Sequence, residues 1–218
     1  MTEPRPLLAV AHRSGNTLAG LREALDAGVD LVEADVHAYR GRLEVRHHRS
    51  MGGLPFLWDR DGVVPRSRHG RFELADLVAA LGDDHRLMID LKGVHPRLAP
   101  KVARVLRETS PGRSLTVCTK SWWMLDAFDV PVQRVLSAGS RRGLGRLRSR
   151  VAAGPVHGVS VRLSMLTPQL VTELHRGTDL VMAWTVDTPA ALARAREVGA
   201  DAVISKDLDL LRGVLAER

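Results

Sequence analysis

The chain alternates short β-prone apolar runs with segments in which apolar residues recur at helical spacing. Short apolar runs suit buried strands, and an i, i+3, i+4 spacing suits helices packed against them. This alternation predicts α/β layering with mostly parallel strands. The expected strands cover 7–12, 30–36, 43–48, 86–91, 114–119, 132–137, 158–163, 180–186 and 202–205.

The expected helices are bounded by residues that commonly cap helices. They cover 17–27, 73–81, 98–108, 167–175 and 189–198, with Thr17, Thr167 and Thr188 as N-caps and Gly28, Gly177 and Gly199 after the last turns. This rhythm predicts a TIM (β/α)8-type barrel, in which one of the expected strands is an extra. We expect residues 1–218 to form a single domain.

The connection between the second and third expected strands is too short to hold a helix. A hairpin that turns at Arg40-Gly41 would place Glu33 opposite His48, and an extended return would also bring these two residues close. The predicted barrel therefore has a short, helix-free connection at this point. The segment 51–71 is rich in Gly, Pro, Arg and Asp, so we expect a long surface loop there.

Charge favours anionic partners, since Lys and Arg outnumber Asp and Glu by 32 to 25, for a net charge of +7. The segment 141–150 holds five arginines, which could meet nucleic acid or an anionic membrane. It lacks the interleaved aromatic residues of a single-strand binder, and a solvated helix face is the simpler interpretation. We therefore expect no nucleic-acid partner and at most weak membrane contact.

The single cysteine, Cys118, excludes an internal disulfide. No apolar run is long enough to cross a membrane, and the N-terminus has no basic-then-apolar signal pattern. These features predict a cytoplasmic protein, and they leave its oligomeric state open.

Titratable residues gather where four of the expected strands end, and these ends share one face of a parallel barrel. They are His12 and Arg13, Glu33 and Asp35, His47 and His48, and Asp90 and Lys92. Three carboxylates suit calcium or magnesium, two histidines suit proton transfer, and an arginine with a lysine suits an anion. The combination predicts metal-assisted cleavage of a phosphate ester. Of the adjacent pair, His48 is expected in the site and His47 outside, with exchange of the two as the alternative.

The ordered motifs resemble those of the glycerophosphodiester phosphodiesterases, a TIM-barrel family of the phospholipase-C-like superfamily. The resemblance covers nearly the whole chain. It rests on His12-Arg13, Gly15-Asn16-Thr17, Gly28-Val29-Asp30, Val32-Glu33-Ala34-Asp35-Val36, Val45-Arg46-His47-His48, Ile89-Asp90-Leu91-Lys92, Ala183-Trp184-Thr185-Val186-Asp187 and Gly199-Ala200-Asp201-Ala202-Val203-Ile204-Ser205.

The resemblance implies hydrolysis of a small phosphodiester to glycerol 3-phosphate and an alcohol through a cyclic phosphate. It also implies residue roles: His12 and His48 as the acid/base pair, Glu33, Asp35 and Asp90 as ligands of a divalent cation (calcium or magnesium), Arg13 and Lys92 on the phosphoryl oxygens, and Trp184 near the alcohol portion.

Several positions depart from the family pattern. Ser14 replaces a glycine in a shortened loop, the glutamate before Asn16 is absent, and Asp90 replaces a glutamate. The family's His-Asp pair aligns with His48-Arg49, and a late Thr-Asp pair with Ser205-Lys206. These changes bear on metal affinity and substrate choice more than on the fold.

Two alternatives remain. A lipid-directed phosphodiesterase, of the lysophospholipase D or sphingomyelinase D type, would use Phe56, Leu57 and Trp58 as an apolar mouth. A barrel that has lost catalysis would only bind phosphate-containing ligands, because a fold alone does not imply activity.

Overall fold

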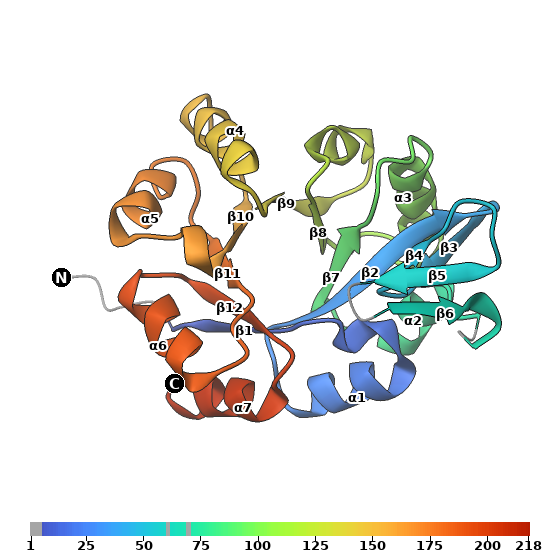
Figure 1. Ribbon diagram of the computed structural model, residues 1–218, viewed down its shortest axis with the longest axis horizontal. Coiled ribbons are helices and arrows are strands. Elements are labelled where there is room, and N and C mark those ends of the chain that lie inside the picture. The colour runs from blue at the N-terminus through green and yellow to red at the C-terminus, as the bar shows by residue number, and fades with distance from the viewer. Residues whose placement is uncertain (1–5, 60–61, 69–70) are drawn as a thin grey trace.

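The computed structural model describes residues 6–59, 62–68 and 71–218. Eight parallel strands close into a barrel, because β1 pairs with β2 on one side and β12 on the other (Figure 1). The predicted TIM-type barrel is confirmed. Its strands are β1 (Leu8–Ala11), β2 (Leu31–Tyr39), β7 (Leu87–Leu91), β8 (Leu115–Thr119), β9 (Val132–Ala138), β10 (Gly158–Arg162), β11 (Val181–Trp184) and β12 (Ala202–Ser205).

Helices surround the strand ring in Figure 1. They are α1 (Leu18–Asp26), α2 (Leu74–Leu81), α3 (Leu98–Thr109), α4 (Arg141–Ala152), α5 (Pro168–Leu174), α6 (Pro189–Glu197) and α7 (Leu208–Ala216). The predicted N-caps are confirmed, since each threonine hydroxyl accepts a backbone N–H of its own helix. The arginine-rich segment forms α4, whose Leu147 and Val151 are buried while its five arginines are exposed. Among the described helices, none has the length and apolar character needed to cross a bilayer.

Two apolar layers hold the barrel together. Outward-facing strand residues such as Val32, Ala34 and Val36 pack with the helices in the larger core. Inward-facing residues fill the barrel itself, and they come from strands all round the ring: Val10, Met88, Cys118, Val135, Met182, Ala202 and Ile204. Because successive side chains alternate between these layers, the next inward position along each strand lies at the carboxyl end of the barrel.

The extra strand is the one after the short connection. β3 (Arg42–Val45) runs antiparallel to β2, and the hairpin turns at Arg40 and Gly41, both with positive φ. The predicted register is confirmed where the strands pair, because Val36 lies opposite Val45. It does not extend to His48, since β3 ends at Val45 and the chain then leaves the barrel.

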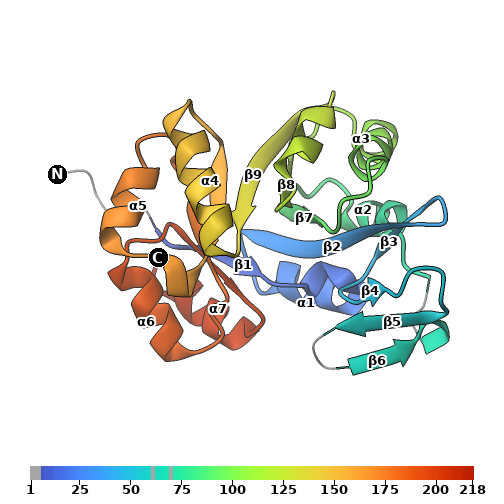
Figure 2. The same ribbon diagram turned by 45° about the horizontal axis from the view of Figure 1, so that its top comes forward.

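The expected long surface loop over 51–71 proves to contain two strands. This part of the chain contributes to a small antiparallel sheet beside the barrel, formed by β4 (Arg49–Ser50), β5 (Phe56–Asp59) and β6 (Gly62–Pro65) (Figure 2). Leu57 is fully buried between exposed Phe56 and Trp58, which is strand alternation too short to stand out among turn residues. Residues 60–61 and 69–70 of the expected loop lie outside the described residues.

A Gly-x-Asp sequence starts two of the barrel strands in the same way. Gly28 and Gly199 have φ of 78° and 77° after α1 and α6, where a glycine is favoured. Two residues later, Asp30 Oδ2 accepts the N–H of Ala9 at 2.6 Å, and Asp201 Oδ2 accepts that of Val181 at 2.7 Å. Each aspartate thus ties the start of its strand to the neighbouring strand.

We expect Asp30→Ala and Asp201→Ala each to lower the free energy of unfolding by about 1–3 kcal/mol, because each leaves a backbone N–H without its charged acceptor. Urea denaturation of both variants would measure the loss. Asp83→Ala removes an exposed aspartate and should stay within about 0.5 kcal/mol of wild type. Equal effects of all three substitutions would contradict the role assigned to the motif.

Candidate active site

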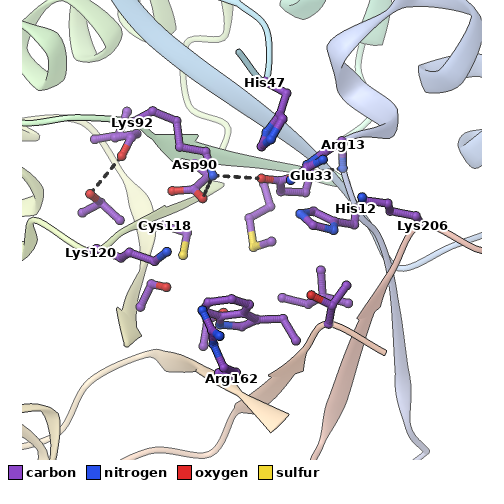
Figure 3. A pocket seen from close by; sticks show the side chains of 18 of the residues that line it. His12, Arg13, Glu33, His47, Asp90, Lys92, Cys118, Lys120, Arg162 and Lys206 are labelled. Atoms are coloured by element: carbon purple, nitrogen blue, oxygen red, sulfur yellow. Dashed lines mark hydrogen bonds and ion pairs between the residues drawn. The ribbon is translucent and has the colours of Figure 1, made fainter. Parts of the chain in front are cut away.

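A cavity of about 910 Å³ opens at the carboxyl end of the barrel. Side chains from the ends of β1, β2, β7, β8, β10, β11 and β12 line it, as Figure 3 shows for the labelled residues. Active sites of this fold lie on this face, because every strand delivers its last inward residue there. The predicted convergence of strand ends is therefore confirmed in space.

Three carboxylates form an acidic triad, defined by Glu33, Asp35 and Asp90. The first two stand two residues apart on β2, so they share its inward face. Asp90 is the register partner of Asp35 on β7. One ligand atom from each carboxylate lies within 4.8 Å of the others, and Glu33 and Asp35 are buried.

The Lys92 ammonium lies among these carboxylates, as Figure 3 shows for Glu33 and Asp90. Its Nζ is 2.5 Å from Asp35 Oδ1 and 3.8 Å from Glu33 Oε1, and it donates to Asp90 Oδ2. Burial disfavours the charged lysine, but Asp90 and Asp35 outweigh it and raise the pKa of Lys92 well above its usual value. Lys92 is therefore a fixed cation.

One ammonium does not neutralise three acids. Burial, followed by the nearby charge of Asp35, raises the pKa of Glu33 well above its usual value. Burial also opposes ionisation of Asp35, but Lys92 and hydrogen bonds from His47, Lys92 and Asn16 bring its pKa well below the usual value. The triad thus holds more acid groups than its own cation can keep ionised.

A divalent cation fits this triad. Hard cations such as calcium and magnesium take oxygen ligands, and three carboxyl groups converge here, more than Lys92 alone can keep ionised. The ligand atoms of these three carboxyl groups lie close enough together to bind one ion. Glu33, Asp35 and Asp90 would hold it, as the sequence predicted.

The turn after β1 presents His12 and Arg13 to the cavity. Arg13 has φ of 63°, a left-handed conformation, and its backbone N–H donates to Glu33 Oε2 at 2.6 Å. The Arg13 guanidinium Nε lies 4.0 Å from Asp35 Oδ2. Both predicted phosphate-binding residues, Arg13 and Lys92, therefore border the triad.

Asn16 holds the Asp35 carboxylate in place through two hydrogen bonds to this residue. Its side-chain Nδ2 donates to Asp35 Oδ2 at 2.8 Å, and its Oδ1 accepts the Asp35 backbone N–H at 2.8 Å. The sequence motif contained Asn16 without assigning it a role. Gly15 is buried below, where a Cβ would come within 2.8 Å of the Ala34 Cβ.

His12 lies in a position that favours its neutral form. Burial, followed by the charge of Arg13, lowers the pKa of His12 to about 3. Its Nδ1 is buried and has no hydrogen-bond partner among the described residues. At neutral pH the His12 imidazole is therefore unprotonated, which is the form that a general base needs.

The prediction for the adjacent histidines was wrong about which one enters the site. His47 lines the cavity, and its Nδ1 lies 3.2 Å from Asp35 Oδ2. His48 Nε2 is instead 3.1 Å from Asp59 Oδ2 of the small sheet. The error came from extending the β2–β3 register past Val45, where the pairing ends.

His37 also lines the cavity, two residues beyond Asp35 on the inward face of β2. Burial, followed by the charge of Arg46, lowers the pKa of His37 to about 3. Its Nε2 is buried without a hydrogen-bond partner among the described residues. The sequence could have indicated this position, because His37 follows Glu33 and Asp35 at the two-residue spacing of one strand face.

Trp184 lines the cavity, as predicted, at the end of β11. Lys120 Nζ lies 4.8 Å from the centroid of its ring, and Arg162 Cζ lies 5.2 Å from it. Sequence reasoning missed both cations, together with Lys206. Each of the three follows an inward-facing strand residue by two positions: Lys120 follows Cys118, Arg162 follows Ser160 and Lys206 follows Ile204.

No family model matches the chain. A probable glycerophosphodiester phosphodiesterase 2 of Mycobacterium tuberculosis is 27% identical over 248 residues, covering 97% of this chain and 91% of that protein. A glycerophosphodiester phosphodiesterase structure from Thermotoga maritima has a TM-score of 0.75 at 18% identity and covers 97% of this chain and 98% of its own.

A phosphodiesterase from Oleispira antarctica, solved with the product sn-glycerol-3-phosphate, has a TM-score of 0.74 at 17% identity, with 96% of each chain covered. These solved structures share the barrel, and the Mycobacterium protein shares recognisable sequence along almost the whole chain. The resemblance indicated by the motifs is confirmed: the chain has the barrel fold of these solved structures and is similar to a glycerophosphodiester phosphodiesterase along almost its whole length.

Proposed function

We propose that residues 1–218 form a single phosphodiesterase domain that hydrolyses glycerophosphodiesters to glycerol 3-phosphate and an alcohol. The observation that carries the proposal is that an acidic triad, the cations Arg13 and Lys92, and the histidines His12 and His47 converge at one cavity. The product bound to the Oleispira antarctica relative supports the same chemistry. Glu33, Asp35 and Asp90 hold a divalent cation, either calcium or magnesium.

In the proposed first step, a glycerol hydroxyl attacks phosphorus and the bond to the leaving alcohol breaks. His12, neutral because its pKa is lowered to about 3, accepts the hydroxyl proton. His47 donates a proton to the departing alkoxide. The Asp35 carboxylate beside Nδ1 orients the His47 ring and leaves Nε2 for the substrate. Water then opens the cyclic phosphate, with the two histidine roles reversed.

Arg13 and Lys92 bind the non-bridging phosphoryl oxygens in this mechanism, because both border the triad with fixed positive charge. A bound divalent cation would supply Lewis-acid stabilisation of the same oxygens. The buried triad keeps Lys92 in place before substrate arrives, so little rearrangement is needed during the reaction.

We expect His12→Ala and His47→Ala each to lower kcat by about 100-fold or more, the usual range for loss of a general acid or base. The assay is release of glycerol 3-phosphate from glycerophosphoinositol. His48→Ala is the matched control, since that ring pairs with Asp59 instead of Asp35, and should keep most of the turnover. Thermal unfolding would verify that all variants fold. The opposite pattern, with His48 essential and His47 dispensable, would refute the assignment.

We expect a chelator to abolish turnover and calcium or magnesium to restore it. Asp35→Ala and Asp90→Asn should each weaken the metal Kd by roughly tenfold or more, the lower end for residues that merely support a metal ligand. Calorimetric titration of the metal would measure this. Asp187→Asn changes another carboxylate of the cavity, outside the triad, and should leave the metal Kd near the wild-type value.

A lipid-directed phosphodiesterase remains the second candidate, because Phe56 and Trp58 are 40% and 39% exposed on one face of β5, and Trp58 lines the cavity. This candidate predicts turnover of lysophosphatidylcholine that falls severalfold in Phe56→Ser, while glycerophosphocholine turnover does not. Assays of both substrates with both proteins would decide. No lysophospholipid turnover by wild type would exclude it.

A further inference from the structure

A second group of cations lines the cavity away from the acidic triad. Lys120 follows β8, and Arg162 and Trp184 end the adjacent strands β10 and β11, where they are register partners. Figure 3 shows Lys120 and Arg162 entering the cavity from a different side than His47 and Arg13. We call Lys120, Arg162 and Trp184 the cationic wall.

The wall is held in place by packing. Both cations lie against the indole of Trp184, within the range of cation–π attraction. Gly139 lies behind the indole, where an added Cβ would come within 2.9 Å of Trp184 Cη2 and 3.3 Å of Lys120 Cε. The absence of a side chain at Gly139 therefore makes room for this arrangement.

Lys92 forms ion pairs with carboxylates, but the two cations of the cationic wall do not. Across the described part of the chain, neither Lys120 nor Arg162 has a carboxylate within ion-pair distance. Arg162 Nε and Trp184 Nε1 are buried, and within the same residues neither has a hydrogen-bond partner. Asp187 also lines the cavity, but its carboxylate accepts hydrogen bonds from the Lys206 backbone N–H and the Ser205 hydroxyl.

Grouped cations repel one another, and neither Lys120, which is partly exposed to solvent, nor Arg162, which is half-buried, has an acid in ion-pair contact among the described residues. Burial, followed by the charge of Lys92, lowers the pKa of Lys120. An anion placed between Lys120 and Arg162 would relieve this repulsion, and it would also meet the free donors of Arg162 and Trp184. The wall is thus built like an anion site.

We propose that the cationic wall binds a phosphate group carried by the alcohol half of the substrate. The inference rests on the proposed function, in which the diester phosphate lies at Arg13, Lys92 and the acidic triad. The alcohol half then extends across the cavity towards Trp184. The protein accordingly selects glycerophosphodiesters whose head group bears its own phosphate.

The same geometry acts against cationic head groups. A quaternary ammonium binds best to a free aromatic face or near a carboxylate. Here two cations lie against the indole of Trp184, so such a head group would meet repulsion. The cationic wall therefore attracts a phosphorylated head group and repels a cationic one.

The test compares two substrates that differ by one phosphate, glycerophosphoinositol 4-phosphate and glycerophosphoinositol. We expect wild type to favour the phosphorylated substrate in kcat/KM by roughly tenfold or more, the gain from one charge-assisted hydrogen bond. Arg162→Met and Lys120→Met should each bring that ratio close to one. Arg142→Met removes an exposed arginine of α4 and should keep the wild-type ratio. Equal turnover of both substrates by wild type, or an unchanged ratio in the wall variants, would overturn the inference.

A binding arm separates this inference from the proposed function. If no glycerophosphodiester is hydrolysed, the proposed function fails, but inositol 4-phosphate can still be titrated calorimetrically into wild type and the same variants. Binding that weakens in Arg162→Met and Lys120→Met, but not in Arg142→Met, supports the wall. No binding to wild type, or equal binding to all four proteins, refutes it.

Discussion

The placement of three carboxylates around one lysine ammonium governs how the carboxyl end of this barrel is built. Buried charges are tolerated only when they are paired and hydrogen-bonded. Asp35, with no exposure to solvent, recruits partners from three separate segments: Asn16 after β1, His47 after β3 and Lys92 after β7. The loops that carry the proposed catalytic groups are therefore fixed by a single acid. The left-handed backbone of Arg13 follows from the same cluster, because its N–H donates to Glu33.

Much of the fold could be predicted, because its period-two strands and capped helices follow local rules. β3 was identified from a connection too short for a helix, and Thr17, Thr167 and Thr188 marked helix starts through their own hydroxyls. The helix α7 was not among the predicted elements, and α4 was anticipated only as a solvated helix face over 141–150. In α4, the run of arginines hides the spacing of its few buried residues, Leu147 and Val151.

The site was harder to predict than the fold, because its geometry depends on where strands end. Alternation brings together the residues that lie within a regular strand or directly after one: His12, Glu33, Asp35, Asp90 and Lys92. His47 and His48 follow the last paired residue of β3, where alternation no longer applies. Lys120 and Arg162 obeyed the alternation but drew no attention, since a single basic residue after a strand has no motif of its own.

The corrected placement of His47 changes how one departure from the family pattern is understood. If His47 is the histidine of the family's His-Asp pair, the second position is His48, which brings no carboxylate. Asp59 of β5 supplies one, 3.1 Å from His48 Nε2, and Asp59 also lines the cavity. Arg46 reinforces the turn by donating to the His48 carbonyl. The second strand of the small sheet thus provides the acid that pairs with His48, the residue next to His47, while His47 itself is oriented by Asp35 of the barrel.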